Sequence, residues 1–141
     1  HPEGVPTALY RLDADKLTLQ QEPLPCGGVA IAAEGSTVYV AGTDRRLYEC
    51  GKKAPRSLAG PFTGDITAIV PVSNGRVAVL NGKRIDIAST KDGQTVQTLE
   101  LPEDGTCLAA DRSGSWLAAG TAKGTVAVFD GQDKEDFEPS E

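Results

Sequence analysis

The sequence predicts an all-β chain in which one small antiparallel sheet is repeated. Three observations support this fold class. The 141 residues include 16 Gly and 9 Pro, whereas aromatic residues make up only 5%. Short apolar runs alternate with Gly-containing turns, which is the pattern of short strands in antiparallel meanders. The same order of runs and turns then recurs along the chain, and no helical periodicity of useful length interrupts it.

The repeat has a period of about 39 residues. It divides the chain into segments 26–63, 64–103 and 104–141, preceded by the shorter segment 2–25. Each full segment contains a short apolar strand, a turn with Gly, a second strand, a tight turn, a third strand and a polar connection to a weaker fourth strand. Leu9-Tyr10 aligns with Leu47-Tyr48 in the next segment. We therefore interpret the first segment as the second half of a preceding unit.

A four-stranded meander has two faces and cannot bury both by itself. Stacking such sheets around an axis buries them together, and a period near 40 with four strands is typical of a β-propeller blade. The predicted fold is a set of about three and a half blades, each a four-stranded antiparallel sheet. Because propellers close with about four to eight blades, we expect an incomplete ring or half of a dimeric propeller. Exposed blade faces at the ends favour self-association or completion by further blades.

Core and edge positions follow from the repeat. Trp116, Phe129 and Cys107 lie in apolar strand patterns, so we expect them to pack in the core as structural residues. The acidic tail 133–141 has a single aromatic residue. The repeat requires a fourth strand there, and we predict a weak one around residues 135–138.

The stretch DRSGSWLAAGTAKGTVAVFDG, residues 111–131, resembles the WD-repeat signature. Asp111-Arg112-Ser113-Gly114 matches the first turn, Ala119-Gly120-Thr121 the second motif, and Val128-Phe129-Asp130 the closing one. Neither a Gly-His nor a Trp-Asp dipeptide occurs, so the hydrogen-bonded tetrad typical of that family cannot form in its full version. The resemblance implies blades that present binding surfaces and do not catalyse reactions.

Composition argues against several function classes. The net charge of −6 and the pI of about 4.8 provide no general attraction to nucleic acid or anionic membranes. No apolar run approaches the ~20 residues of a membrane span. Three widely spaced cysteines are not a disulfide framework, which favours a reducing, cytoplasmic location. The absence of Met indicates a piece of a longer protein, and the frequent Ala and Gly favour a bacterial source.

Catalytic and metal-binding groupings are not evident. The single His is residue 1, which excludes Ser-His-Asp and Cys-His catalysis and a set of zinc ligands. The Gly turns lead into strands, whereas a phosphate loop leads into a helix. We therefore predict no catalytic residue, no metal and no cofactor.

One pattern indicates binding. In a blade of this type, the turn between the second and third strands shares a face with the connections between blades. These turns carry the candidate partner-binding residues, which are Asp44, Arg45, Arg46, Lys83, Arg84 and Lys123. Arg forks there would suit an acidic peptide or a phosphate group; solvated turn residues are the alternative.

The function that we predict is a non-catalytic interaction or scaffold module with a protein or peptide partner. One alternative is a fragment of a larger propeller enzyme, quinoprotein-like or a hydrolase, whose catalytic residues lie outside this chain. Another is a structural element whose blades mainly mediate self-association. Fold alone does not decide among them.

Overall fold

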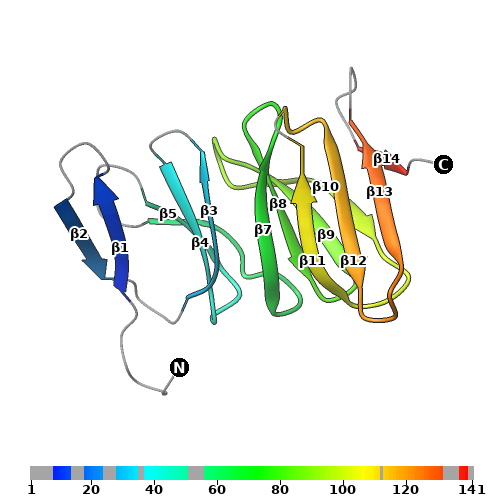
Figure 1. Cartoon of the computed structure of the whole chain (residues 1–141), viewed down its shortest axis with the longest axis horizontal. Helices are drawn as coiled ribbons and strands as arrows, with labels where there is room; N and C mark the ends of the chain where they lie inside the picture. Colours follow the sequence, from blue (N-terminus) through cyan, green and yellow to red (C-terminus); the bar gives the residue numbers. More distant parts are fainter. Residues whose placement is uncertain are drawn as a thin grey trace.

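The computed structural model of the chain describes residues 8–13, 18–23, 28–34, 37–50, 56–111, 113–131 and 137–139. Within these ranges, every regular element is a β-strand, and no helix occurs. Three four-stranded antiparallel sheets follow one another along the long axis of the molecule, and a two-stranded sheet precedes them in the chain (Figure 1).

The two-stranded sheet pairs β1 (Ala8–Asp13) with β2 (Thr18–Pro23) and belongs to the predicted half blade. Sheet I contains β3 (Gly28–Glu34), β4 (Thr37–Gly42), β5 (Leu47–Cys50) and β6 (Arg56–Ala59). Sheet II contains β7 (Ile66–Val72), β8 (Arg76–Asn81), β9 (Arg84–Ser89) and β10 (Thr95–Glu100). Sheet III contains β11 (Gly105–Ala110), β12 (Trp116–Thr121), β13 (Val126–Asp130) and β14 (Glu138–Pro139).

Each sheet is a meander in which neighbouring strands follow one another in sequence. The first strands meet at the inner edge of the stack, where β7 lies between β3 and β11. The later strands of each sheet extend outward from that edge (Figure 1). This is the arrangement of propeller blades. The three sheets do not close a ring, so the predicted all-β fold of an incomplete propeller is confirmed.

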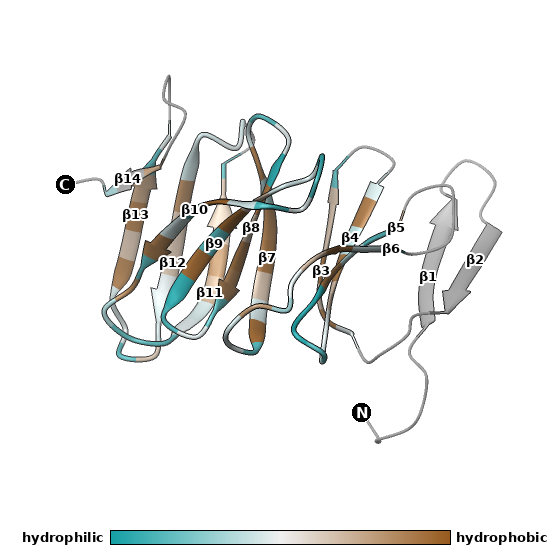
Figure 2. Cartoon of the chain, turned by 180° about the vertical axis from the view of Figure 1, so that it is seen from behind, coloured by the Kyte–Doolittle hydropathy of each residue, from teal (hydrophilic) through white to brown (hydrophobic). Residues whose placement is uncertain are grey.

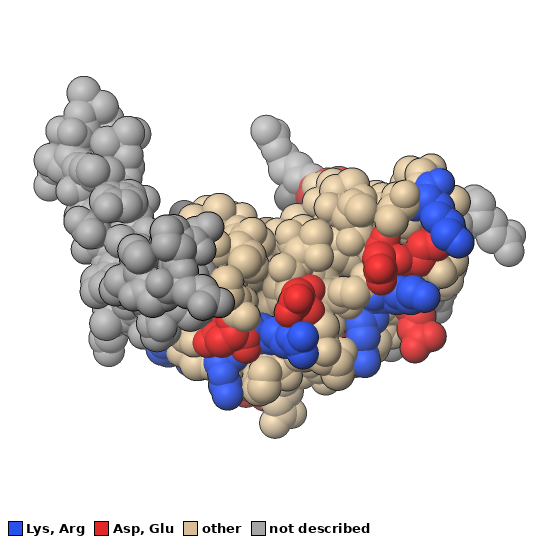
Figure 3. Space-filling view, turned by 90° about the horizontal axis from the view of Figure 1, so that it is seen from below, with Lys and Arg blue, Asp and Glu red and all other residues tan. Residues whose placement is uncertain are grey.

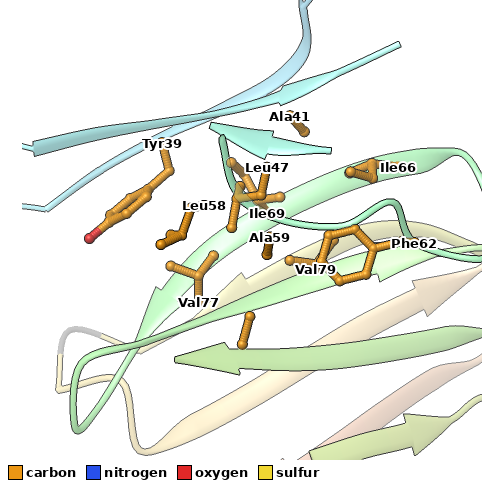
Figure 4. Close-up of a cluster of buried hydrophobic side chains, with 11 residues drawn as sticks. Tyr39, Ala41, Leu47, Leu58, Ala59, Phe62, Ile66, Ile69, Val77 and Val79 are labelled. Carbon is orange, nitrogen blue, oxygen red and sulfur yellow. The ribbon is translucent and has the colours of Figure 1, made fainter. Parts of the chain in front are cut away.

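Sheets I and II enclose the first hydrophobic core. Tyr39, Ala41 and Leu47 of sheet I face Val77 and Val79 of sheet II (Figure 4). Both valines are completely buried, and Tyr39 is only 5% exposed. Alternation along β8 therefore places one set of side chains against sheet I and the other set against sheet III.

Sheets II and III enclose the second core. Leu80 and Ile87 of sheet II pack against Leu117 and Phe129 of sheet III, as predicted for Phe129. Phe137, from the acidic tail, joins the same core and is 2% exposed. Its neighbours in β14 pair with the end of β13. The predicted tail strand is thus present at 138–139; residues 132–136 lie outside the described ranges.

The blades also meet at their turns, and Gly114 illustrates how closely. Its φ angle is 73°, and a Cβ atom built there would lie 2.5 Å from the backbone nitrogen of Ser73. That nitrogen donates a hydrogen bond to the carbonyl oxygen of Gly114 at 3.0 Å. Only glycine satisfies both the dihedral angle and the approach, so the β11–β12 turn of sheet III is fixed against the β7–β8 turn of sheet II.

Two core predictions were wrong. Trp116 is 37% exposed, and the Cys107 thiol belongs to an exposed residue. Both side chains lie on the outer face of sheet III, which no described residue covers. The repeat pattern predicts burial at these positions because they lie in apolar strands. It cannot show that sheet III is the last of the described sheets, so it cannot predict that this face is exposed.

Candidate binding face

The turns between second and third strands lie beside the connections between sheets, as the sequence predicted. We call this surface the turn face; it comprises turns 43–46, 82–83 and 122–125 with connections 60–65 and 101–104. Five of the six candidate residues lie on it: Asp44, Arg45 and Arg46 in the first turn, Lys83 in the second and Lys123 in the third. The sixth, Arg84, is the first residue of β9 and directly follows the second turn. The structure therefore places the sequence-predicted site on one side of the molecule.

The connection 101–104 is hydrogen-bonded to the turns on both sides of it. The Leu101 nitrogen donates to the Lys83 carbonyl oxygen at 2.7 Å, in the turn of sheet II. The Ala122 nitrogen, in the turn of sheet III, donates to the Asp104 carbonyl oxygen at 2.8 Å. The Thr125 hydroxyl adds a side-chain bond to the Glu103 carboxylate at 2.9 Å. These bonds hold the turn and the connection in one fixed arrangement.

The connection 60–65 is fixed in the same way. The Phe62 nitrogen donates to the Arg45 carbonyl oxygen at 2.8 Å, in the turn of sheet I. The Gly64 nitrogen donates to Asn81 Oδ1 at 3.4 Å, at the end of β8 in sheet II. Each described connection thus joins two neighbouring sheets, and the turn face is a continuous surface with a stable backbone.

Charges of both signs occupy the turn face. Arg45 donates to the Asp65 carboxylate at 2.8 Å, and Arg84 to the Asp86 carboxylate at 3.3 Å. Viewed from this side, basic and acidic side chains alternate across the surface (Figure 3). The candidate residues are therefore together, but they do not form a purely basic cluster.

Three of the candidate cations have unengaged side chains in the described part of the chain. Among the described residues, no hydrogen bond or ion pair involves the side chains of Arg46, Lys83 and Lys123, one on each sheet. Asp44 has a structural role, since its carboxylate accepts hydrogen bonds from the Tyr48 hydroxyl and the Arg46 nitrogen. These bonds stabilise the first turn.

A buried polar network lies beneath the second turn. The Asp86 carboxylate, with 5% of its side chain exposed, accepts hydrogen bonds from Thr98 Oγ1 at 2.7 Å and Asn81 Nδ2 at 2.9 Å. Arg84 also donates to this carboxylate, and its own Nε is buried without a partner among the described residues. On the connection side, Thr63 Oγ1 lies 3.4 Å from Asn81 Oδ1. The network ties the third and fourth strands of sheet II to the connection from sheet I.

Sequence reasoning missed this network. The repeat alignment considered charged residues in turns, whereas Asn81, Asp86 and Thr98 lie on strands. One signal was available: Asp86 interrupts the apolar run of β9. The equivalent position in β5 is occupied by Tyr48. A carboxylate in an inward-facing strand position indicates polar partners nearby.

A groove of about 450 Å³ lies at the opposite ends of the first strands. Its lining includes Glu34, Asn74 and Asp111, from all three sheets. The Asp111 carboxylate accepts hydrogen bonds from the Ser113 hydroxyl at 2.6 Å and from the Ser115 and Trp116 nitrogens at 2.9 Å. These bonds, with that of Ser113 the largest contribution, lower the pKa of Asp111 below its ordinary value.

The lowered pKa of Asp111 predicts how stability depends on pH. A carboxyl group with a depressed folded-state pKa stabilises the fold above its unfolded pKa, near 3.9, and loses that contribution as the pH falls through the folded value. We expect Asp111→Asn to melt at a lower temperature than the original chain at pH 7, with the gap closing in acid. Thermal melts from neutral to strongly acidic pH would measure the gap; a constant gap would contradict the role of the charge.

Among the described residues, no cluster of His, Cys, Asp and Glu side chains has the arrangement of a metal site. The described part of the chain likewise contains no helix with the length and apolar character needed to span a membrane.

Comparisons with known proteins support the fold. No family model matches the chain, and no curated protein does. Among solved structures, a chain of hydrazine synthase from Kuenenia stuttgartiensis superimposes with a TM-score of 0.76 at 13% sequence identity. The match covers 94% of this chain and 43% of that one, so the chain spans less than half the length of this structural relative. At this identity, the likeness concerns the fold alone.

Proposed function

We propose that this chain is a non-catalytic interaction module and that its turn face binds a protein or peptide partner. The observation that carries the proposal is the hydrogen bonding of both described connections to the sheets on either side. A surface with a fixed backbone loses little conformational entropy on binding, which favours affinity. The WD-repeat character of the blades is part of the proposal, supported by the Asp111 turn and the motif sequence in residues 111–131.

The partner chemistry follows from the charges. Arg45 and Arg84 are engaged with acidic residues, whereas Arg46, Lys83 and Lys123, on three neighbouring sheets, have no such partner among the described residues. A peptide with several carboxylates spaced along it would meet one cation from each sheet. Complementary charge raises the association rate and selects the partner, so binding would weaken as salt is added.

A larger propeller enzyme remains the alternative proposal. In that case, the catalytic residues lie outside these 141 residues, and the present blades support them. The two proposals differ in what the turn face does, because only the interaction module requires it to bind a partner.

Charge reversal tests the proposal. Peptides would be selected from a displayed library on the immobilised chain, and their dissociation constants measured. We expect acidic peptides, and we expect the triple variant Arg46→Glu, Lys83→Glu, Lys123→Glu to weaken their binding by about tenfold or more, since three charge contacts are reversed.

The matched control is Lys91→Glu. Lys91 is exposed in the turn between β9 and β10, at the opposite end of sheet II. The Lys91→Glu variant should therefore bind the peptides with the affinity of the original chain. Selected peptides that bind the triple variant as tightly as the original chain would show that the turn face is not the binding surface.

A further inference from the structure

Arg45 has a backbone conformation that its residue type disfavours. Its φ angle is 65°, in the left-handed region, where a Cβ atom is crowded by its own backbone. Of the described residues other than glycine, only Arg45 and Asn74 have a positive φ angle, and asparagine tolerates this region better than arginine does. Figure 2 shows the turn that carries Arg45 as a hydrophilic loop between β4 and β5. An arginine is therefore present in this turn at a conformational cost.

The equivalent turn of sheet III shows which residue this position favours. The Arg45 nitrogen donates a hydrogen bond to the Gly42 carbonyl oxygen at 3.1 Å, and the Gly124 nitrogen donates to the Thr121 carbonyl oxygen at 3.0 Å. Arg45 thus stands where sheet III has Gly124, whose φ angle is 84°. Glycine adopts such an angle without steric cost. The turn does not require an arginine, and strained residues of this kind concentrate at ligand-binding sites.

The guanidinium of Arg45 is engaged by an exposed carboxylate. Its Nε donates to Asp65 Oδ1 at 2.8 Å, and its Nη1 donates to the Thr63 carbonyl oxygen at 3.3 Å. The side chains of Arg45 and Asp65 are 48% and 85% exposed. An exposed ion pair contributes little to stability, because water solvates both charges well. A carboxylate from a bound peptide can therefore replace Asp65 at low cost.

Arg84 differs from Arg45 in the burial of its acidic partner. Only 5% of the Asp86 side chain is exposed, and its carboxylate also accepts hydrogen bonds from Asn81 and Thr98. Removing Arg84 from this carboxylate would disrupt the buried network of sheet II. Of these two arginines, Arg45 is the one whose carboxylate partner can exchange.

We propose that Arg45 binds a carboxylate of the acidic peptide, and that Asp65 occupies the same guanidinium in the unbound chain as an internal competitor. The assignment rests on the proposed function, because it names a contact through which the turn face recognises its partner. A guanidinium can donate two parallel hydrogen bonds to one carboxylate, whereas Asp65 accepts only from Nε. The peptide thus gains a stronger contact than the one that it displaces.

A double-mutant cycle tests the roles of Arg45 and Asp65 with the acidic peptides selected on the chain. Arg45→Gly should weaken peptide binding about tenfold or more, since a charge-assisted contact is lost. Asp65→Asn should strengthen binding about threefold, the value of an exposed ion pair that no longer has to be broken. In the Arg45→Gly background, Asp65→Asn should lose this effect, because the two residues act through one contact.

Melting curves distinguish binding from a structural role of Arg45. Arg45→Gly should melt, by circular dichroism, at no lower a temperature than the original chain, because glycine relieves the backbone conformation. Arg45→Lys retains the charge without the planar fork, so it should also weaken peptide binding.

Asp104→Asn is the matched control for the change in charge. Asp104 is the exposed residue directly before β11, which is the place that Asp65 takes before β7. Among the described residues, no hydrogen bond or ion pair involves its carboxylate. Asp104→Asn removes one negative charge from the turn face without releasing an arginine, so it should strengthen peptide binding less than Asp65→Asn does.

The triple charge-reversal variant separates failure of this assignment from failure of the proposed function. If the triple variant weakens binding but Arg45→Gly does not, the turn face binds the peptide without Arg45. If neither variant changes the affinity, the proposed function fails together with the role of Arg45. An Asp65→Asn variant that binds no more tightly than Asp104→Asn would show that Asp65 is not a competitor. A lower melting temperature for Arg45→Gly would give Arg45 a structural role instead.

Discussion

Phe137→Ala is expected to destabilise the chain by about 3–5 kcal/mol, the usual range for truncating a buried Phe. The ring is 2% exposed in the core between sheets II and III, and the Arg76 guanidinium lies 5.2 Å from its centroid. The backbone is fixed as well, because the Phe137 nitrogen donates to Gln97 Oε1 at 2.8 Å and Gln97 Nε2 donates to the Phe137 oxygen at 2.7 Å. Urea unfolding, followed by circular dichroism, would measure the loss.

Phe137→Leu provides the control. It retains an apolar side chain of nearly sufficient volume, so the cost should be about 1 kcal/mol. A loss of less than about 1 kcal/mol for Phe137→Ala would contradict the assignment of this residue to the core. In that case β14 would contribute little to the third blade.

Asp86→Ala is expected to cost about 3 kcal/mol, because hydrogen bonds to a charged acceptor are lost and their donors stay buried. Asn81 and Thr98 would each lose a partner, and Arg84 would lose its counter-ion. Since Arg84 keeps 39% of its side chain exposed, it can turn to solvent, which limits the total. Chemical unfolding of the variant would give this value.

The comparison with Asp86→Asn separates charge from hydrogen bonding. Asparagine retains one oxygen acceptor, so Asp86→Asn should lower the free energy of unfolding by less than Asp86→Ala does. A second control, Asp65→Ala, removes an ion pair at a carboxylate with 85% of its side chain exposed, and should cost less than about 1 kcal/mol. Equal losses for Asp86→Ala and Asp65→Ala would show that the buried network does not stabilise sheet II.

The sequence predicted the architecture because a repeat constrains every blade at once. The strand at Val126–Asp130 was recognisable by its likeness to earlier segments, and its turn by the Gly and Thr residues around Lys123. The positions of the candidate residues on one face followed from the same register. These inferences needed only local pattern and the rule that strands alternate their side chains.

What the sequence could not show depends on contacts between distant residues. The pairing of Asp65 with Arg45 requires the connection to pass beside the turn of sheet I. Phe137 stood in an acidic tail, and only its contacts with Gln97, 40 residues away, place it in the core. The exposure of Trp116 depends on what lies beyond sheet III, which no repeat pattern contains.

The meander order of each sheet has a consequence for how the chain folds. Every strand pairs with its immediate neighbour in sequence, so each blade can form from local contacts with small loop-closure entropy. Chains with such short-range pairing fold faster than sheets assembled from distant segments. The hydrogen bonds between connections and turns then join blades that have already formed. Folding can therefore advance blade by blade along the chain, with the Gln97 and Phe137 contact closing the last blade onto the one before it.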